Sequence, residues 1–250
     1  MAVIERARTM TPWRWRDVPL VLMYHTVDVL TDDPHRLAVS PRRFVRQLAT
    51  LRRLGLRGVG VGHLLAARRA GRSAGLVGIT FDDGYAGVVR HALPAMRRFG
   101  CTATVFVVAD RIGAVNDWDG GELALLDGPD LAALAGAGWE IGAHGARHVP
   151  LAGLGDATLR DEVTGSRDRL AALLDAPVDG FCYPYGSMDA AARAAVTAAG
   201  YRYACAVDAP RAAIGVAAVP RIYVGERDGA LRLTGKRVLY RARLASGGRS

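Results

Sequence analysis

Short apolar runs alternate with longer amphipathic stretches along most of the chain. The short runs have the length and the β-branched or aromatic content of strands, and the longer stretches repeat apolar residues at helical spacing. Ser40 and Pro41 have the character of an N-cap and a first-turn proline, so a helix is expected to begin there. Strands are predicted over residues 20–25, 76–81, 102–108, 139–143, 178–183, 203–207 and 219–224, helices over residues 87–99, 130–137, 159–174 and 188–199, and a further strand–helix pair within residues 58–70.

This alternation predicts parallel strands joined by right-handed crossovers. About seven or eight strands with about six helices suit an irregular α/β fold, a (β/α) barrel with short loops, and a doubly wound open sheet is the alternative. Both architectures place ligands at the carboxyl ends of the strands. We therefore predict one catalytic domain over residues 18–225, flanked by basic tails at residues 1–17 and 226–250.

Composition and charge narrow the class of protein. Half of the 250 residues are hydrophobic and 23% are charged, which is typical of a globular protein. The first 16 residues carry four arginines but no apolar core behind them, so no secretory signal is indicated and a cytoplasmic location is predicted. Most of the net charge of +9 lies in the two tails. We interpret these tails as solvated ends and expect no nucleic-acid partner, with peripheral contact to an anionic membrane as an alternative.

Asp82 and Asp83 are the strongest chemical signal, because they follow a predicted apolar strand and precede Gly84. Two carboxylates that share one cleft repel each other, so at least one needs a cation or a proton. His144 and His148 follow another predicted strand, in a glycine-rich loop that can direct both imidazoles to one point. With one carboxylate they form a His-His-Asp set typical of a catalytic Zn²⁺ or a similar divalent ion. The alternative is that the two histidines only cap neighbouring backbone groups.

Three segments resemble the motifs of a known family. Thr80-Phe81-Asp82-Asp83-Gly84 and His144-x-x-x-His148 resemble the first two motifs of the polysaccharide deacetylases, the NodB-homology or carbohydrate esterase family 4 enzymes. Phe181-Cys182-Tyr183-Pro184-Tyr185-Gly186 resembles their third motif, and the resemblance covers roughly residues 18–225. It implies a distorted (β/α) barrel that removes N- or O-linked acetyl groups from sugars with a divalent metal, Zn²⁺ or alternatively Co²⁺ or Ni²⁺.

The resemblance also implies roles for individual residues. Asp82 is expected to be the general base, and Asp83 is expected to bind the metal together with His144 and His148. The backbone N–H of Tyr185 is expected to stabilise the oxyanion, and Pro184 precedes it in the motif.

The expected general acid is displaced along the chain. The family normally supplies a histidine from a C-terminal Leu-x-His, but no histidine follows His148. Leu22-Met23-Tyr24-His25 resembles the missing motif near the N-terminus, as in circularly permuted members whose last barrel strand comes first. We therefore expect His25 to be the general acid, and we interpret the remaining histidines as bystanders: His35, His63 and His91.

Two other positions depart from the family pattern. The third motif usually contains an arginine that pairs with the base carboxylate, and residues 176–186 contain none, so Arg221 is the candidate substitute. Gly145 replaces the usual Ser or Thr of the second motif and removes a hydroxyl that can support the metal loop.

The expected substrate is an acetylated carbohydrate. Trp118, in a Gly/Asp-rich loop, is expected to contact it, whereas Trp139 lies on a predicted strand and is expected in the core. Three alternatives stay open: a carbohydrate-binding pseudoenzyme of the same fold, a hydrolase of a non-sugar amide, and a membrane or nucleic-acid binder that acts through residues 226–250.

Overall fold

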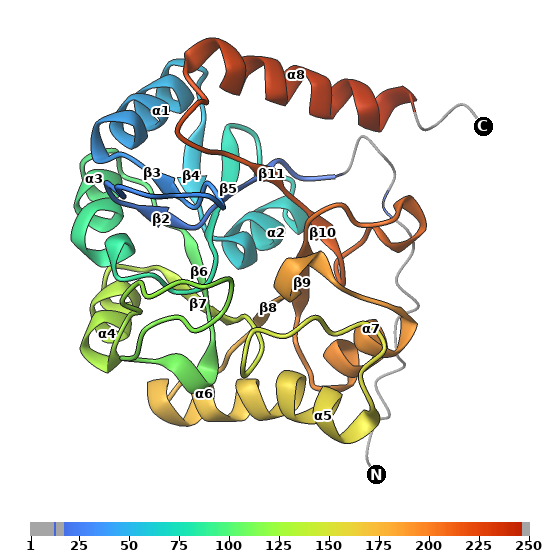
Figure 1. Ribbon diagram of the computed structural model, residues 1–250. Helices are drawn as coiled ribbons and strands as arrows, with labels where there is room; N and C mark the ends of the chain where they lie inside the picture. Colours follow the sequence, from blue (N-terminus) through green and yellow to red (C-terminus); the bar gives the residue numbers. More distant parts are fainter. Residues whose placement is uncertain (1–12, 14–17, 247–250) are drawn as a thin grey trace.

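Parallel strands form a nearly closed barrel with helices around it in the computed structural model, which describes residue 13 and residues 18–246 (Figure 1). The predicted (β/α) barrel is confirmed. The hydrogen-bonded order is β10 (Val219–Pro220), β9 (Tyr203–Ala206), β8 (Gly180–Cys182), β7 (Glu140–Ala143), β6 (Thr104–Val107), β5 (Leu76–Phe81), β1 (Val21–Tyr24) and β11 (Ile222–Tyr223), and β4 (Arg57–Val59) also pairs with β5.

One extended segment closes the barrel. β10 and β11 are separated only by Arg221; β10 pairs with β9, and β11 pairs with β1. Counted as one, they leave seven strands on the hydrogen-bonded path, in line with the sequence prediction. The N-terminal strand β1 therefore lies between β5 and the C-terminal strand β11, the neighbourhood that a permuted barrel requires.

The helices largely follow the predicted spans, and most of them lie outside the barrel. They are α1 (Pro41–Arg53), α2 (Val61–Arg69), α3 (Leu93–Arg98), α4 (Gly128–Gly136), α5 (Asp156–Arg160), α6 (Ser166–Leu174), α7 (Ala190–Ala198) and α8 (Ala230–Ser246). Single π-helical turns at Val88–Ala92 and Asp161–Gly165 precede α3 and α6. The Ser40 hydroxyl caps α1 by accepting from Arg43 N, as predicted, and a capping box between Asp127 and Asp130 starts α4 earlier than predicted.

Aromatic stacking fixes the end of β5 in the core. The Phe81 ring lies 5.5 Å from the rings of both Tyr24 and Trp139, measured between centroids. Trp139 is therefore a core residue, as expected. Because Phe81 is anchored in this way, the two aspartates that follow it are held at the carboxyl end of the strand.

Two features fall outside the predicted barrel. A small parallel sheet of β2 (Thr26–Val27) and β3 (Ala38–Val39) follows β1, and the sequence did not predict it. The predicted tail over residues 1–17 lies, except for residue 13, outside the described residues, and the predicted tail over residues 226–250 contains α8. None of the helices in the described part of the chain has both the length and the apolar content that crossing a membrane requires.

Candidate active site

A pocket of about 380 Å³ brings together side chains that are far apart in the sequence. Seven of the nine predicted site residues line it: His25, Asp82, Asp83, His144, His148, Tyr185 and Arg221. Trp118 and Pro184 lie outside its wall. Pro184 is buried at the start of the short 3₁₀ turn that carries Tyr185.

Asp83, His144 and His148 form a compact donor set. The Nε2 atoms of both histidines lie 3.3 Å from the same carboxylate oxygen, Asp83 Oδ1. His144 Nδ1 lies 2.8 Å from the Cys182 carbonyl, which can only accept, so Nδ1 carries a proton and Nε2 is left to face the carboxylate. One ligand atom from each residue lies within 4.8 Å of the other two. Two imidazole nitrogens and a carboxylate oxygen in this arrangement fit a single divalent cation.

The pKa shifts of Asp83 and His144 also indicate that this donor set attracts positive charge. Burial raises the pKa of Asp83, but hydrogen bonds from His144 and His148 override burial and bring the pKa well below its usual value. Burial lowers the pKa of His144, but the neighbouring Cys182 and Asp83 raise it well above the ordinary value. The carboxylate therefore stays ionised and attracts either a proton to His144 or a cation to the site.

The backbone around the pocket is strained. Among the described residues, seven non-glycine residues have positive φ, and five of these line the pocket: Arg36 (φ +57°), Asp83 (+68°), Asp119 (+55°), His148 (+61°) and Tyr185 (+56°). Such conformations cost on the order of 1–3 kcal/mol each and persist where the surrounding structure imposes them. Their concentration at one pocket indicates that side-chain placement there overrides backbone preference.

Aromatic rings hold His148 from two sides. Its ring centroid lies 4.5 Å from that of Trp118 and 4.6 Å from that of Tyr185. Trp118 is buried against the His148 ring and so orients a donor side chain, and its expected contact with the substrate stays a prediction. Tyr185 is half exposed, and its hydroxyl donates to Asp119 Oδ1 at 3.2 Å.

Asp82 forms a buried bidentate ion pair with Arg221. Arg221 Nη1 and Nη2 donate to the two carboxylate oxygens at 2.6 and 2.7 Å. The guanidinium also donates to Thr80 Oγ1 and Cys182 Sγ, both at 3.0 Å. Burial raises the pKa of Asp82, but the charge and hydrogen bonds of Arg221 outweigh burial and lower the pKa below its usual value. Arg221 therefore lies beside the first aspartate, where the sequence analysis expected a substitute for the third-motif arginine.

His25 follows β1 and lines the same pocket. Its Nδ1 atom is buried without a hydrogen-bond partner among the described residues, and its ring lies 6.4 Å from that of Tyr223. His35, which the sequence analysis interprets as a bystander, also lines the pocket. Asp33 brings this about, because its carboxylate accepts from Leu37 N and Ala38 N and folds the loop before β3 toward the pocket mouth.

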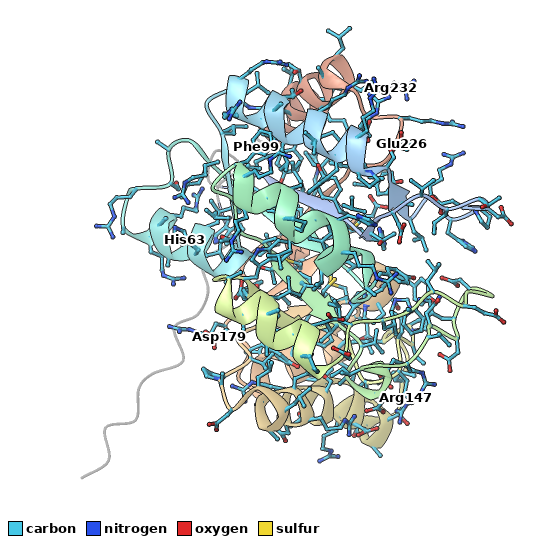
Figure 2. All side chains as sticks on the ribbon, turned by 90° about the vertical axis from the view of Figure 1, so that its left-hand side faces the viewer. His63, Phe99, Arg147, Asp179, Glu226 and Arg232 are labelled. Atoms are coloured by element: carbon cyan, nitrogen blue, oxygen red, sulfur yellow. The ribbon has the colours of Figure 1, made fainter. Side chains whose placement is uncertain are left out.

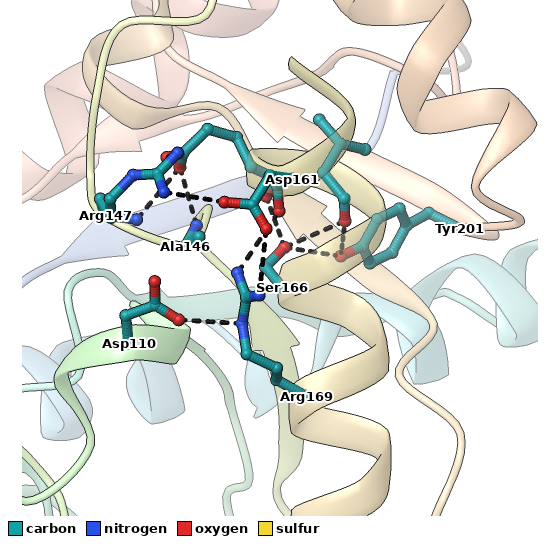
Figure 3. Close-up of polar contacts among 9 residues, drawn as sticks. Asp110, Ala146, Arg147, Asp161, Ser166, Arg169 and Tyr201 are labelled. Carbon is teal, nitrogen blue, oxygen red and sulfur yellow. Dashed lines mark hydrogen bonds and ion pairs between the residues drawn. The ribbon is translucent and has the colours of Figure 1, made fainter. Parts of the chain in front are cut away.

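A buried glutamate supports the histidine loop. Glu162 Oε2 accepts from Ala146 N at 2.8 Å and from Arg147 N at 3.1 Å. Its other oxygen lies 2.8 Å from the Arg147 guanidinium, which also binds Asp161 (Figure 3). The π-turn at Asp161–Gly165 presents this carboxylate, and Ser166 donates to the Glu162 carbonyl at 2.6 Å. The sequence did not predict a role for Glu162, because an Asp-Glu pair on a helix is typical of a solvent-exposed face.

Glu162 also explains the glycine at position 145. Gly145 has φ +77°, and a Cβ atom there would lie 2.9 Å from Glu162 Oε2. A Ser or Thr side chain would therefore be both strained and crowded. The carboxylate of Glu162, and not a hydroxyl at position 145, supports this loop.

Comparisons with known proteins agree with this fold. The sequence model of the family described as "Polysaccharide deacetylase" matches residues 69–204. The deacetylase PplD of Streptococcus pyogenes, solved in complex with acetate, superposes with a TM-score of 0.75 at 20% identity over 90% of this chain and 99% of that chain. IcaB of Ammonifex degensii superposes with a TM-score of 0.71 at 25% identity over 88% of this chain and 97% of that chain. A de-N-acetylase of Aggregatibacter actinomycetemcomitans superposes with a TM-score of 0.72 at 16% identity over 87% of this chain and 98% of that chain. No curated protein matches the sequence significantly.

Proposed function

Because the chain belongs to the polysaccharide deacetylase family, whose members hydrolyse N-acetyl or O-acetyl groups, we propose that it deacetylates a carbohydrate with one divalent cation held by Asp83, His144 and His148. The convergence of both imidazole Nε2 atoms on one oxygen of Asp83 carries this proposal. Zn²⁺ suits this donor set best, with Co²⁺ or Ni²⁺ as alternatives. When bound, such an ion supplies Lewis-acid polarisation of the acetyl carbonyl and lowers the pKa of water.

Asp82 is the proposed general base. Arg221 keeps its carboxylate ionised at neutral pH and fixes its orientation through two parallel hydrogen bonds. An ionised, oriented carboxylate next to the donor set can take a proton from the attacking water. The pseudoenzyme alternative was based on the absence of the third-motif arginine. Because Arg221 pairs with Asp82, this argument for a pseudoenzyme no longer applies.

His25 and Tyr185 are proposed to act on the departing group and on the developing charge. His25 enters the pocket from β1, so its imidazolium can protonate the leaving nitrogen or oxygen. The backbone N–H of Tyr185 forms no hydrogen bond to the described residues and is free to stabilise the tetrahedral oxyanion. One such donor contributes about 3 kcal/mol to the lowering of a barrier.

The substrate is proposed to be an acetylated sugar or oligosaccharide. The half-exposed ring of Tyr185 offers a surface on which a sugar ring can pack. The PplD structure contains acetate, and acetate is the product that this reaction would release. An amide attached to a non-sugar group is the competing substrate class.

Acetate release from N-acetylated chito-oligosaccharides and from small non-sugar amides, measured with elemental analysis of the same preparations, tests the proposal. Asp83→Ala is expected to lose both the bound metal and turnover, whereas Asp82→Asn is expected to keep the metal and lose turnover. His63→Ala is the matched control, because His63 is exposed on α2, outside the pocket. Full turnover by Asp82→Asn, or turnover by a wild-type protein that contains no metal, would contradict the proposal.

A further inference from the structure

The outward face of α8 is apolar, which reverses the usual pattern of a surface helix. Leu231, Val238 and Leu239 are 90%, 60% and 62% exposed. Together with Gly235 and Ala242 they follow the spacing i, i+4, i+7, i+8 and i+11, so they form one stripe along the helix. We call these five residues the α8 stripe.

The opposite face of α8 fixes the helix to the barrel. Leu233 is buried, and the Tyr240 hydroxyl donates to the Pro19 carbonyl at 3.1 Å. Lys236 Nζ donates to the Tyr223 carbonyl at 2.8 Å and to Asp228 Oδ2 at 2.5 Å. α8 runs along one edge of the molecule (Figure 1). The α8 stripe is therefore displayed by an anchored element and is not covered by any described part of the chain.

Positive charges flank the α8 stripe. Arg232 lies on one side of it and Arg237 lies on the other, and residues 229–250 contain no acidic residue. Figure 2 shows Arg232 at the end of the molecule opposite Arg147. Arg232 is exposed and forms no ion pair or hydrogen bond with the described residues. An apolar stripe bordered by cations is the pattern of a helix that lies in the interface of an anionic membrane.

We propose that α8 docks this protein on the surface of an anionic lipid bilayer. The apolar stripe enters the boundary between headgroups and acyl chains, and the flanking cations bind lipid phosphates. A second cavity, of about 730 Å³, lies along the edge of α8 that carries Arg232, Lys236 and Leu239. Arg36 and Tyr223 line both this cavity and the candidate active site, so docking through α8 brings the mouth of the active site close to the lipid surface.

Vesicle flotation tests the docking directly. The wild-type protein is expected to float with vesicles of phosphatidylglycerol and phosphatidylcholine at low ionic strength, and to float much less with phosphatidylcholine alone. The double variant Leu231→Ser/Val238→Ser is expected to lower the partition coefficient at least roughly tenfold. Arg232→Ser is expected to lower it roughly fivefold, and high salt is expected to remove that difference.

Matched controls separate docking through α8 from nonspecific adsorption to vesicles. Leu173→Ser removes a half-exposed leucine from α6, and Arg98→Ser removes an exposed arginine from α3; both are expected to float like the wild type. Circular dichroism checks that each variant is folded. Absence of wild-type flotation, or equal flotation of the α8 double variant, would overturn the proposal. Sedimentation of lipid-free protein as a dimer that the double variant loses, without flotation, would also overturn it and assign the stripe to a second copy. Flotation needs no turnover, so its outcome is independent of the proposed function.

Discussion

Replacing Arg221 with methionine would leave Asp82 as a buried carboxylate without a counter-ion. The two side chains are 1% and 4% exposed, so water cannot take over the role of the guanidinium. Removal of one partner from a buried pair typically costs about 3–5 kcal/mol of unfolding free energy. Methionine keeps most of the apolar stem of arginine and removes the guanidinium, whose carbon lies 5.7 Å from the centroid of the Phe106 ring, so the loss reports mainly on charge.

A double-mutant cycle separates this electrostatic effect from packing. Asp82→Asn/Arg221→Met removes both charges, so it is expected to be more stable than Arg221→Met alone. The interaction energy is expected near the upper end of the ~0.5–3 kcal/mol seen for contacting residues. Arg221→Lys is expected to lie between wild type and methionine, because an ammonium cannot form two parallel bonds to one carboxylate.

The pH dependence has a defined sign. The folded pKa of Asp82 is lowered by Arg221, so the pair contributes stability above the unfolded pKa of about 4, and this contribution is lost as the pH falls through the folded pKa. Without Arg221, burial raises the pKa of Asp82, and stability is then lost as the pH rises toward that raised pKa. The difference in unfolding free energy between wild type and Arg221→Met is therefore expected to increase between about pH 4 and pH 7.

Urea unfolding in the presence of a chelator, across this pH range, measures the effect without a contribution from metal binding. Arg202→Met is the matched control, because Arg202 pairs with Asp179 at 3.3 Å on the surface, where side-chain exposures are 70% and 34%. That pair is expected to contribute less than about 1 kcal/mol. The buried pair does not stabilise the protein as expected if Arg221→Met loses no more unfolding free energy than Arg202→Met and if its difference from wild type does not change with pH.

Three further variants test the rest of the site. His25→Ala is expected to lower kcat about 10²–10⁴-fold with unchanged metal content, and steady-state kinetics showing full turnover would exclude it as the acid. Glu162→Gln is expected to weaken metal affinity by about tenfold or more, measured by chelator competition, because the carboxylate supports the histidine loop; unaltered affinity would contradict this. Gly145→Ala is expected to lose more unfolding free energy in urea than Gly153→Ala. Both glycines have positive φ, but only Gly145 faces Glu162, so equal losses would show that crowding is unimportant.

Strong local signals explain which parts of the fold could be predicted. The strand at 76–81 is an apolar run stopped by Asp-Asp-Gly, and its observed bounds match the prediction. Ser40 could be placed as a cap because its chemistry acts within one helical turn. The two π-turns were not predicted, because one extra residue in a turn barely disturbs the apolar period.

Other parts of the site depend on contacts that no local pattern encodes. The two-residue strands β2 and β3 are too short to show alternation, so the loop that carries His35 toward the pocket could not be placed. Cys182 lies within the third motif, but its contact with Arg221 depends on the meeting of β8 with the closing segment. Glu162 is buried only because the π-turn rotates it toward the histidine loop.

The closure of the barrel explains how a site can keep its geometry when its parts move along the chain. β1 lies between β5 and β11, so His25, Asp82 and Arg221 come from neighbouring strands although they are separated by up to 196 residues (221 minus 25). Neighbouring strands are about 4.8 Å apart, so side chains at adjacent carboxyl ends can meet across one pocket. Chemistry depends on this spatial order and not on chain order. A histidine supplied by the first strand and an arginine supplied by the last can therefore serve the same pair of aspartates.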